Sequence, residues 1–348
     1  MSTPVATAPV CVTGASGFIA AHIVRELLAR GYRVRGTVRN PARTTELQFL
    51  GDLPGAAERL ELVAGELTRA DGWDAAVAGC DVVMHTASPY VIAVKDPQRD
   101  LVDPAVNGTR HVLEACRRAG VRRVVLTSSV AAITDEPEQD RVLTEADWNT
   151  KSSLGRNPYY FSKVLAEREA WRIVERDQPG FDLVVINPFM VIGPSLSPSL
   201  NTSPKIFADL ANGAYPGIFA LTWGLVDVRD VAEAHVRAME TPGAAGRYLC
   251  AGERLSMREV VGVLREAGVR GRLPSLPMDG AAGTAFVKLL SYFQPAGVGS
   301  YLRSHLGRVP SYDNGKIRRE LGLAFRPSRT SIQDTVADLR RWGHLPTA

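Results

Sequence analysis

The chain contains 348 residues, of which 45% are hydrophobic and 22% are charged, and its formal net charge is +4. This composition is that of a soluble globular protein, and the length allows one large domain with a smaller second region. The small net charge argues against a nucleic-acid partner and weakly favours anionic small molecules. No apolar run reaches the roughly 18–20 residues of a membrane helix. The N-terminal stretch "MSTPVATAPV" lacks the pattern of a secretion signal, so we predict a cytoplasmic protein without membrane contact.

The cysteines are spread through the chain, at Cys11, Cys80, Cys116 and Cys250. They form no CxxC pair, so the spacing is not that of a zinc site, and we predict no bound metal. A disulfide framework is not expected in a chain of this size. Cys11 and Cys250 lie in apolar, strand-like runs and are interpreted as small buried hydrophobic residues.

Short apolar runs alternate with amphipathic stretches through the first half of the chain. The runs expected to form strands are 9–15, 32–38, 60–65, 81–87, 123–129 and 182–188. Between them lie stretches such as 18–30, in which apolar residues recur at helical spacing. This alternation predicts an α/β fold, a doubly wound parallel sheet with helices on both faces. Gly31, Gly79 and Gly120 follow predicted helices, where a left-handed cap is expected.

A glycine-rich turn joins the first predicted strand to the first predicted helix. The sequence "CVTGASGFIAAHIVRELL" places Gly14, Gly17 and Ala20 at this join. Small residues there let the turn tighten, the backbone approach a pyrophosphate and the helix pack on the strand. The amides at the helix N-terminus then face the phosphates. Glycines also occur in ordinary turns, but this strand–turn–helix context favours dinucleotide binding.

The end of the second predicted strand indicates the type of dinucleotide. An acidic residue at this position would bind the adenosine ribose and favour NAD. The sequence "GTVRNPAR" instead carries Arg39, which can hold a 2′-phosphate with two donors. We therefore predict NADP(H), against the simpler interpretation of a solvated surface arginine. Arg43 adds a second positive charge nearby.

The strand predicted over 123–129 ends in two serines, Ser128 and Ser129. They fall at the carboxyl edge of the sheet, where ligands bind in folds of this kind. A hydroxyl group there can hydrogen-bond a reacting oxygen. Serines after a strand are also common turn residues, so this signal is weak alone.

The stretch "RNPYYFSKVLAEREAW" predicts a helix whose first turns carry Tyr159 and Lys163. Four residues apart, the phenol and the ammonium group lie on the same helix face. The positive charge favours the phenolate form. Such a tyrosine can donate a proton to a carbonyl oxygen as hydride arrives, or accept one in the reverse direction. Tyr160 points elsewhere and is interpreted as a packing residue.

Beyond residue 188 the pattern changes. The segments 188–221 and 270–310 are rich in proline, glycine and serine, whereas 225–240 predicts a helix and 246–252 a strand. We predict a Rossmann domain that binds NADP, built from 1–187 with 222–252. A smaller, interleaved substrate-binding region is built from 188–221 with 253–348.

These motifs, in this order, resemble those of the extended short-chain dehydrogenases/reductases. The matching stretches are "VTGASGFIAAHIVRELLARGY", "GTVRN", "DVVMHTASP", "AVNGTRHVLEAC", "LTSSVAA", "YYFSK", "NPFMVIGP" and "LVDVRDVAEAHVRAME". Within that family the chain resembles the group of dihydroflavonol reductases, cinnamoyl-CoA reductases and methylglyoxal-type aldehyde reductases. The resemblance implies a doubly wound fold, NADPH, and reduction of an aldehyde or ketone to an alcohol.

The resemblance also implies roles for individual residues. Ser128 would orient the carbonyl, Tyr159 would be the acid/base, and Lys163 would bind the nicotinamide ribose. Asn107 would shape the helix behind the site and hold a proton-relay water. The implied cofactor contacts are Gly14, Ser16, Gly17, Phe18, Ile19, Arg39, Glu66, Leu67, Thr86, Ala87, Ser88, Thr127, Tyr159, Lys163, Pro188 and Val191. The predicted substrate contacts are Ser88, Tyr90, Ser128, Val130, Phe189, Met190 and Trp223.

Three positions depart from the group's patterns. Glu66 stands where the group usually has aspartate, and Thr134 stands where the flavonol reductases have asparagine. The segment "NPYYFSK" lacks the tryptophan, cysteine and glycine of the cinnamoyl-CoA reductase signature. Neither a dihydroflavonol nor a CoA thioester is therefore assumed. The apolar residues of the substrate region favour an aryl or alkyl carbonyl compound over a sugar.

Two other functions use the same motifs. An NAD-dependent nucleotide-sugar epimerase or dehydratase shares the fold and the tyrosine–lysine pair, but Arg39 and the apolar segment 188–221 count against it. A non-catalytic NADP-sensing protein would tend to lose Tyr159 or Lys163, and this chain retains both. His85 is interpreted as a packing residue.

Overall fold

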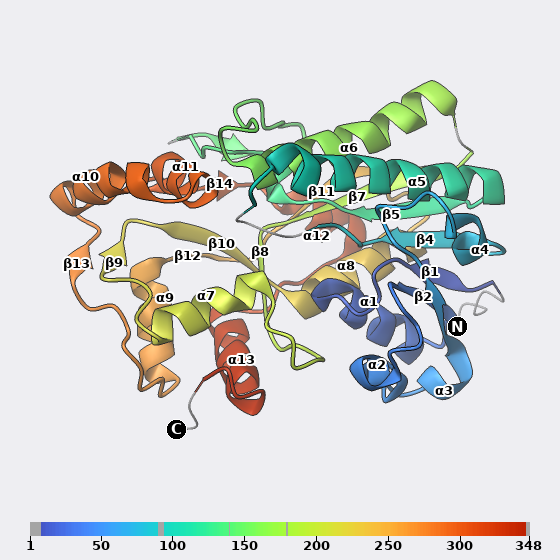
Figure 1. The fold of residues 1–348 in the computed structure, drawn as a ribbon, viewed down its shortest axis with the longest axis horizontal. Coiled ribbons are helices and arrows are strands. Elements are labelled where there is room, and N and C mark those ends of the chain that lie inside the picture. Colours follow the sequence, from blue (N-terminus) through green and yellow to red (C-terminus); the bar gives the residue numbers. More distant parts are fainter. Residues whose placement is uncertain (1–7, 90–93, 139, 179, 346–348) are drawn as a thin grey trace.

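A parallel sheet forms the centre of the protein. The computed structural model describes residues 8–89, 94–138, 140–178 and 180–345. The seven strands of this sheet are β1 (Val10–Val12), β2 (Val34–Val38), β3 (Leu60–Ala64), β4 (Val82–His85), β5 (Arg123–Thr127), β7 (Asp182–Pro188) and β11 (Gly246–Cys250). Their order across the sheet is β11-β7-β5-β4-β1-β2-β3, and every neighbouring pair is parallel (Figure 1).

Helices cover both faces of the sheet, as the alternation of the sequence predicts. One face packs against α1 (Phe18–Ala29) and α8 (Val228–Glu240), and the other against α5 (Asp103–Ala119) and α6 (Pro158–Asp177) (Figure 1). Successive residues of β1 point to opposite faces of the sheet. Val10 and Val12 are buried in the core beneath α1 and α8, and Cys11 is buried in the core beneath α5 and α6. The predicted doubly wound α/β fold is confirmed. Shorter helices complete these layers, namely α2 (Thr44–Gly51), α3 (Ala56–Arg59), α4 (Trp73–Val77), α12 (Gly315–Leu321) and the π-helical turn η1 (Gln98–Val102).

The strand order reverses between β1 and β4. β1 pairs with β2 on one side and with β4 on the other, and the chain crosses from β3 at one edge back to β4. At such a switch point the loops after the two strands diverge, which opens a crevice at their carboxyl ends. The glycine-rich turn after β1 lies at this crevice.

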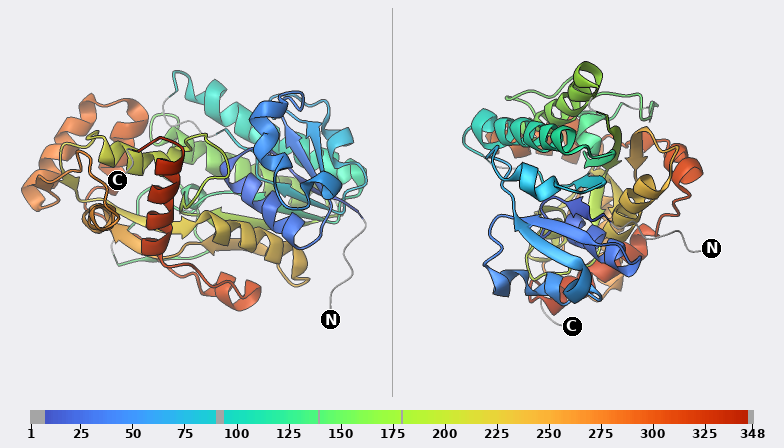
Figure 2. Two further views of the ribbon diagram at one scale, coloured as in Figure 1. Left: turned by 90° about the horizontal axis from the view of Figure 1, so that it is seen from below. Right: turned by 90° about the vertical axis from the view of Figure 1, so that its right-hand side faces the viewer.

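The rest of the chain forms a second, smaller layered region. Its sheet consists of β8 (Met190–Ile192), β10 (Thr222–Asp227) and β12 (Arg254–Ser256). A separate core lies between this sheet and its helices, with Phe207, Trp223 and Val260 buried inside. The left-hand view of Figure 2 shows these C-terminal elements at the end of the molecule away from β2 and β3. The helices are α7 (Thr202–Ala211), α9 (Met257–Glu266), α10 (Ala281–Leu290), α11 (Ala296–His305) and α13 (Ser328–Arg341).

One pair of short strands joins the two regions, β6 (Val142–Leu143) with β14 (Ser311–Tyr312). A second pair, β9 (Ile218–Phe219) with β13 (Pro277–Met278), lies within the smaller region. Two 3₁₀ turns lie at Val130–Ala132 and Ser291–Phe293. Within the described ranges, every helix is too short or too polar to span a bilayer.

One predicted element is wrong in its first residues. We expected a helix over 225–240, but Leu225, Val226 and Asp227 belong to β10 and the helix α8 begins at Val228. The side chain of Asp227 accepts a hydrogen bond from the backbone N–H of Arg229, and this cap fixes the start of the helix. Apolar residues at 225 and 226 fit a buried strand as well as a helix, so periodicity alone does not separate the two.

Other local predictions are confirmed. Gly31, Gly79 and Gly120 have φ of +84°, +68° and +70° after their helices. Cys11, Cys80, Cys116 and Cys250 are buried and unpaired thiols. The predicted domain division assigns 222–252 to the nucleotide-binding domain. In the structure β10 pairs with β8 and β12 of the smaller sheet, whereas α8 and β11 pack with the large one.

Candidate active site

The turn after β1 is built around Gly14. Its φ is +65°, a backbone conformation that L side chains rarely adopt. A Cβ added at Gly14 would lie 3.0 Å from Cβ of Ala87, so the loop after β4 packs directly on the turn. The backbone N–H of Gly14 donates to Oγ1 of Thr37 at 3.0 Å, which ties the turn to β2 as well. Gly17 then caps the N-terminus of α1.

Thr13 and His85 hold the two loops of the crevice together. Oγ1 of Thr13 accepts hydrogen bonds from the backbone N–H groups of Thr86 at 3.0 Å and Ala87 at 2.9 Å. Its own proton is therefore donated to Nδ1 of His85 at 3.0 Å. Burial, with a smaller contribution from the charge of Lys163, lowers the pKa of His85 to about 3 and keeps the ring neutral. The interpretation of His85 as a packing residue is confirmed.

The crevice has the features that a dinucleotide requires. The hydroxyl oxygen of Thr86 is buried and has no hydrogen-bond partner among the described residues, although it lies next to the turn. The approach at Gly14 leaves no room for a side chain, and α1 begins directly after the turn, with Gly17 as its N-cap. A donor or acceptor of the cofactor would satisfy Thr86, and the pyrophosphate would face the amides of α1. The residues present therefore fit NADP(H).

The remaining predicted cofactor residues lie in or after several of the strands and in the glycine turn. Arg39 follows β2 and is exposed, whereas Arg43 pairs with Glu46 at 3.3 Å. Leu67 follows β3 and packs against Gly108 of α5, where a Cβ would come within 2.9 Å of the leucine side chain. Ser16, Phe18 and Ile19 lie in or just after the glycine turn, Glu66 precedes Leu67, and Pro188 and Val191 lie at the end of β7 and in β8.

Lys163 lies at the centre of the predicted reaction site, in the second turn of α6. Its side chain is 7% exposed, and Nζ lies 5.8 Å from the centre of the Tyr159 ring. Nζ donates to Oγ of Ser88 at 2.9 Å. Burial lowers the pKa of Lys163 from 10.5 to about 8, although the negative charge of Glu167 opposes this shift. The structure thus brings Lys163 close to both Tyr159 and Ser88.

This buried ammonium group has a measurable effect on stability. Between about pH 8 and 10.5 the unfolded chain binds a proton at Lys163 that the folded protein has lost, so the free energy of unfolding rises with pH. We expect Lys163→Met to be more stable than the parent at pH 7, by at most about 3 kcal/mol, and this advantage to shrink as the pH approaches 10. Urea unfolding of the two cofactor-free proteins at pH 7 and near pH 10 measures this difference in the free energy of unfolding. An advantage that does not change with pH would contradict the prediction.

Ser128 and Thr127 point to opposite faces of the sheet. Ser128 is 7% exposed, and its hydroxyl donates to Oε2 of Glu167 in α6 at 2.5 Å. Thr127 faces α8 instead. Nδ1 of His235 donates to the carbonyl of Val231 at 2.7 Å, so Nε2 accepts from Thr127 at 2.7 Å. The side chain of Thr127 therefore faces α8, and its predicted contact with the cofactor stays a prediction.

Asn107 lies on the part of α5 that faces α6. Its Oδ1 accepts from Arg110 at 2.9 Å, and the side chain lines a cavity of about 400 Å³ between α5 and α6. That cavity is also lined by Leu165 and Arg168, and neither Tyr159 nor Lys163 belongs to its lining. The predicted relay role of Asn107 stays a prediction.

Four of the predicted substrate residues fall into two apolar clusters. Val130 and Phe189 lie in a small one, where the Phe189 ring contacts Tyr312 at 4.5 Å between ring centres. Trp223 is 5% exposed in the core of the smaller region, with Met190 at the edge of that core. Tyr90 lies outside the described residues.

The start of α6 is fastened to α11. Asn157 has φ of +48°, and its backbone N–H donates to Oγ of Ser300 at 3.0 Å. Its side-chain oxygen accepts from the same hydroxyl at 2.8 Å. Its side-chain nitrogen donates to Ser304 at 3.0 Å and also to the buried carboxylate of Asp135. These bonds fix the helix turn that carries Tyr159 relative to the smaller region.

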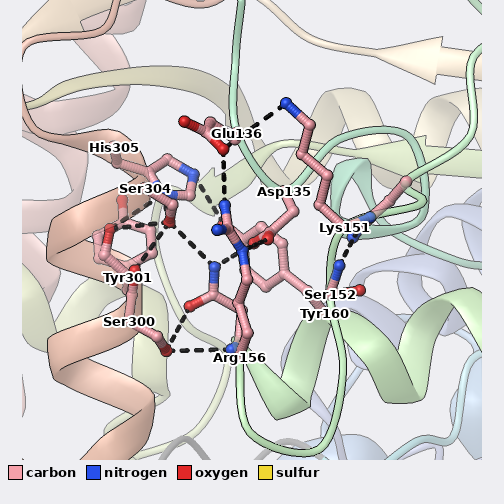
Figure 3. A network of polar contacts seen from close by, with 12 residues as sticks. Asp135, Glu136, Lys151, Ser152, Arg156, Tyr160, Ser300, Tyr301, Ser304 and His305 are labelled. Carbon is pink, nitrogen blue, oxygen red and sulfur yellow. Dashed lines mark hydrogen bonds and ion pairs between the residues drawn. The ribbon is translucent and has the colours of Figure 1, made fainter.

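Tyr160 belongs to the same junction. Figure 3 shows residues of α11 facing Arg156 and Tyr160. The Tyr160 ring makes edge contacts with His305 and Tyr301, at 5.7 and 6.4 Å between ring centres. Arg156 donates to Asp135 at 2.6 Å. The interpretation of Tyr160 as a packing residue is confirmed.

Among the residues that the structure describes, no cluster of histidine, cysteine and carboxylate side chains is suited to a metal ion. The sheet topology and the crevice at Gly14 define a Rossmann-type dinucleotide-binding protein. The chain belongs to the NAD dependent epimerase/dehydratase family, whose model matches residues 10–251.

Individual relatives match almost the whole chain. Cinnamoyl-CoA reductase CAD2 of Medicago truncatula is 40% identical over 344 residues, which are 95% of each chain. Tetraketide alpha-pyrone reductase 1 of Arabidopsis thaliana is 36% identical over 347 residues, which are 97% of each chain. The yeast methylglyoxal/isovaleraldehyde reductase Gre2, solved with NADPH, is 30% identical with a TM-score of 0.79, covering 97% of this chain and 100% of that one. The resemblance that the motifs indicated is confirmed.

Proposed function

We propose that this protein reduces an aldehyde or ketone to an alcohol with NADPH. The observation that carries the proposal is the buried ammonium group of Lys163 beside Tyr159, joined by Ser88 at the crevice of the glycine turn. The names of the relatives support it, because they are reductases of cinnamoyl-CoA, methylglyoxal and isovaleraldehyde, and one of them was solved with NADPH.

The chemistry divides between the cofactor and the chain. When bound, NADPH supplies the hydride. Tyr159 donates its phenolic proton to the carbonyl oxygen, and the charge of Lys163 stabilises the phenolate that results. With a pKa of about 8, Lys163 carries that charge at neutral pH. Ser128 orients the carbonyl from the end of β5.

The substrate is an aryl or alkyl carbonyl compound. Val130 lies two residues after Ser128 and belongs to an apolar cluster with Phe189 and Tyr312, so the chain just beyond the strand-end serines is hydrophobic. Such a surface favours apolar substituents over sugar hydroxyl groups. The segment around Tyr159 lacks the side chains of the cinnamoyl-CoA signature, so a free aldehyde or ketone is favoured over a CoA thioester. The cytoplasmic location, the absence of a nucleic-acid partner and the two-part domain division stay predictions.

Turnover measurements test the proposal. The purified protein is incubated with NADPH or NADH and with an aryl ketone, an alkyl aldehyde, a 2-oxoaldehyde, a cinnamoyl-CoA thioester and a nucleotide sugar, while cofactor absorbance is followed. We expect consumption of NADPH with the apolar free carbonyls. Co-purifying NAD with activity on the nucleotide sugar alone would indicate an epimerase or dehydratase. NADPH binding without turnover of any carbonyl would indicate a sensor.

Arg39 is expected to set the choice between the two cofactors. Replacing it by alanine removes the charge predicted to hold the 2′-phosphate, so we expect the affinity for NADPH to fall roughly 10- to 100-fold, as for a lost hydrogen bond to a charged group, while NADH affinity is retained. Arg43→Ala is the matched control, because Arg43 is already paired with Glu46. Fluorescence titration with each cofactor measures the change. Equal losses for NADPH and NADH would rule out the assignment.

A further inference from the structure

Glu167 is a buried carboxylate next to the predicted reaction site that the proposed chemistry leaves unexplained. Its side chain is 0% exposed. It lies one turn beyond Lys163 on α6, so Tyr159, Lys163 and Glu167 follow one another at intervals of four residues along the same face. An isolated buried carboxylate is unfavourable, so its partners indicate why it is there.

The two oxygens of Glu167 face different partners. Oε2 accepts from the hydroxyl of Ser128 at 2.5 Å and from Nδ2 of Asn187 at 2.8 Å. Oε1 accepts from the indole of Trp171 at 3.2 Å and pairs with Arg247 at 2.6 Å. Ser128 is the donor in its bond to Glu167, and the guanidinium group of Arg247 pairs with the other oxygen of the carboxylate.

This proton fixes the orientation of the Ser128 side chain. A serine hydroxyl has one proton, and here it is donated into the protein, so the oxygen is held with its lone pairs free for other partners. The carboxylate, itself fixed by the bond from Asn187, therefore holds the serine oxygen in place at the end of β5.

We propose that Glu167 is a positioning residue for the reduction, which acts by holding the hydroxyl of Ser128 at the end of β5. This inference rests on the proposed function, because it assigns Glu167 a role through Ser128. A purely structural role is the alternative, since Glu167 also joins α6 to Asn187 of β7 and Arg247 of β11. Buried ion pairs contribute little net stability, so the pair with Arg247 alone does not account for the carboxylate.

A double-mutant cycle separates the two roles. Glu167→Gln is expected to lower kcat about 10- to 100-fold, the factor for a lost hydrogen bond to a charged group, while the NADPH affinity measured by fluorescence stays the same. When Glu167→Gln is added to Ser128→Ala, we expect kcat to change by less than about twofold, because residues that act through one another are not additive.

Trp171→Phe is the matched control, because it removes a donor from the same carboxylate without touching Ser128. We expect it to leave kcat within about twofold of the parent. Glu167→Gln leaves Arg247 buried without its partner and can impair folding. The variant Glu167→Gln/Arg247→Met removes both charges, and it is expected to show the same loss of kcat as Glu167→Gln, with thermal unfolding as the check of folding.

The outcomes distinguish this inference from the proposed function. Suppose that Ser128→Ala lowers kcat. The positioning role is then overturned if Glu167→Gln alone leaves kcat unchanged, or if the loss of kcat in the double variant is the full product of the two single losses. In either case the reductase assignment stands. An equal loss of kcat in Trp171→Phe would also overturn it. If Ser128→Ala leaves kcat unchanged, both the role of Ser128 and that of Glu167 are overturned. Failure of the reductase assignment itself shows as an absence of NADPH turnover in the parent protein.

Discussion

Replacing Tyr159 by phenylalanine is expected to lower kcat for carbonyl reduction roughly 10²- to 10⁴-fold, the range for loss of a general acid. The substitution removes only the phenolic hydroxyl, so the ring keeps its place in the first turns of α6, and Lys163 keeps its bond to Ser88. The affinity for NADPH is expected to stay within about twofold of that of the parent. Absorbance of NADPH measures turnover, and fluorescence titration measures binding.

Tyr160→Phe is the matched control for this experiment. It removes a phenolic hydroxyl one position further along the same helix, where the ring packs against His305 and Tyr301 of α11. We expect this variant to retain kcat, because Tyr160 contacts the smaller region and has no assigned part in proton transfer. Undiminished turnover in Tyr159→Phe, or an equal loss in both variants, would remove the role assigned to Tyr159.

Gly14→Ala is expected to weaken NADPH binding by roughly tenfold or more, the factor for at least one lost hydrogen bond to a charged group. Two effects combine at this position. The φ of +65° disfavours any side chain, and the added Cβ would lie 3.0 Å from that of Ala87, where the backbone must approach the pyrophosphate. Titration of the variant with NADPH measures the loss, and thermal unfolding of the cofactor-free protein measures the backbone strain.

Gly120→Ala separates strain from binding. Gly120 has φ of +70°, close to that of Gly14, but a Cβ there meets nothing within 4 Å. Both variants are expected to lose about 1–2 kcal/mol of stability from the left-handed conformation, and only Gly14→Ala is expected to lose affinity for NADPH. Comparable affinity losses in the two variants would mean that the turn acts on the cofactor only through global stability.

The fold was predictable because its signals are local. Each buried strand of a parallel sheet is a short apolar run, and each surface helix repeats its apolar residues at helical spacing. The glycine turn and the pair formed by Tyr159 and Lys163 are likewise short motifs whose chemistry follows from spacing alone. The boundary between β10 and α8 was missed because Leu225 and Val226 fit both patterns and only the cap at Asp227 separates them.

The parts of the site that were missed depend on contacts between distant segments. Ser128 and Glu167 lie 39 residues apart, and Asn157 and Ser300 lie 143 apart. Nothing in either local sequence indicates the pairing. The interval of four residues from Tyr159 to Lys163 and on to Glu167 was a signal that the sequence contained. It pointed to a shared helix face, but only the packing of β5 against α6 gives that face a role.

The hydrogen bonds between Asn157 and α11 have a consequence for how substrate preference can change. Ser300 and Ser304, which belong to the smaller region, hold the residue two positions before Tyr159. Replacing α11 by the corresponding helix of a relative would therefore remove these bonds and shift the helix turn that carries Tyr159, unless the new helix also had serines at both positions. The smaller region is predicted to bind substrate, so we expect that remodelling α11 while retaining the hydroxyl groups of Ser300 and Ser304 changes substrate preference without disturbing the turn that carries Tyr159.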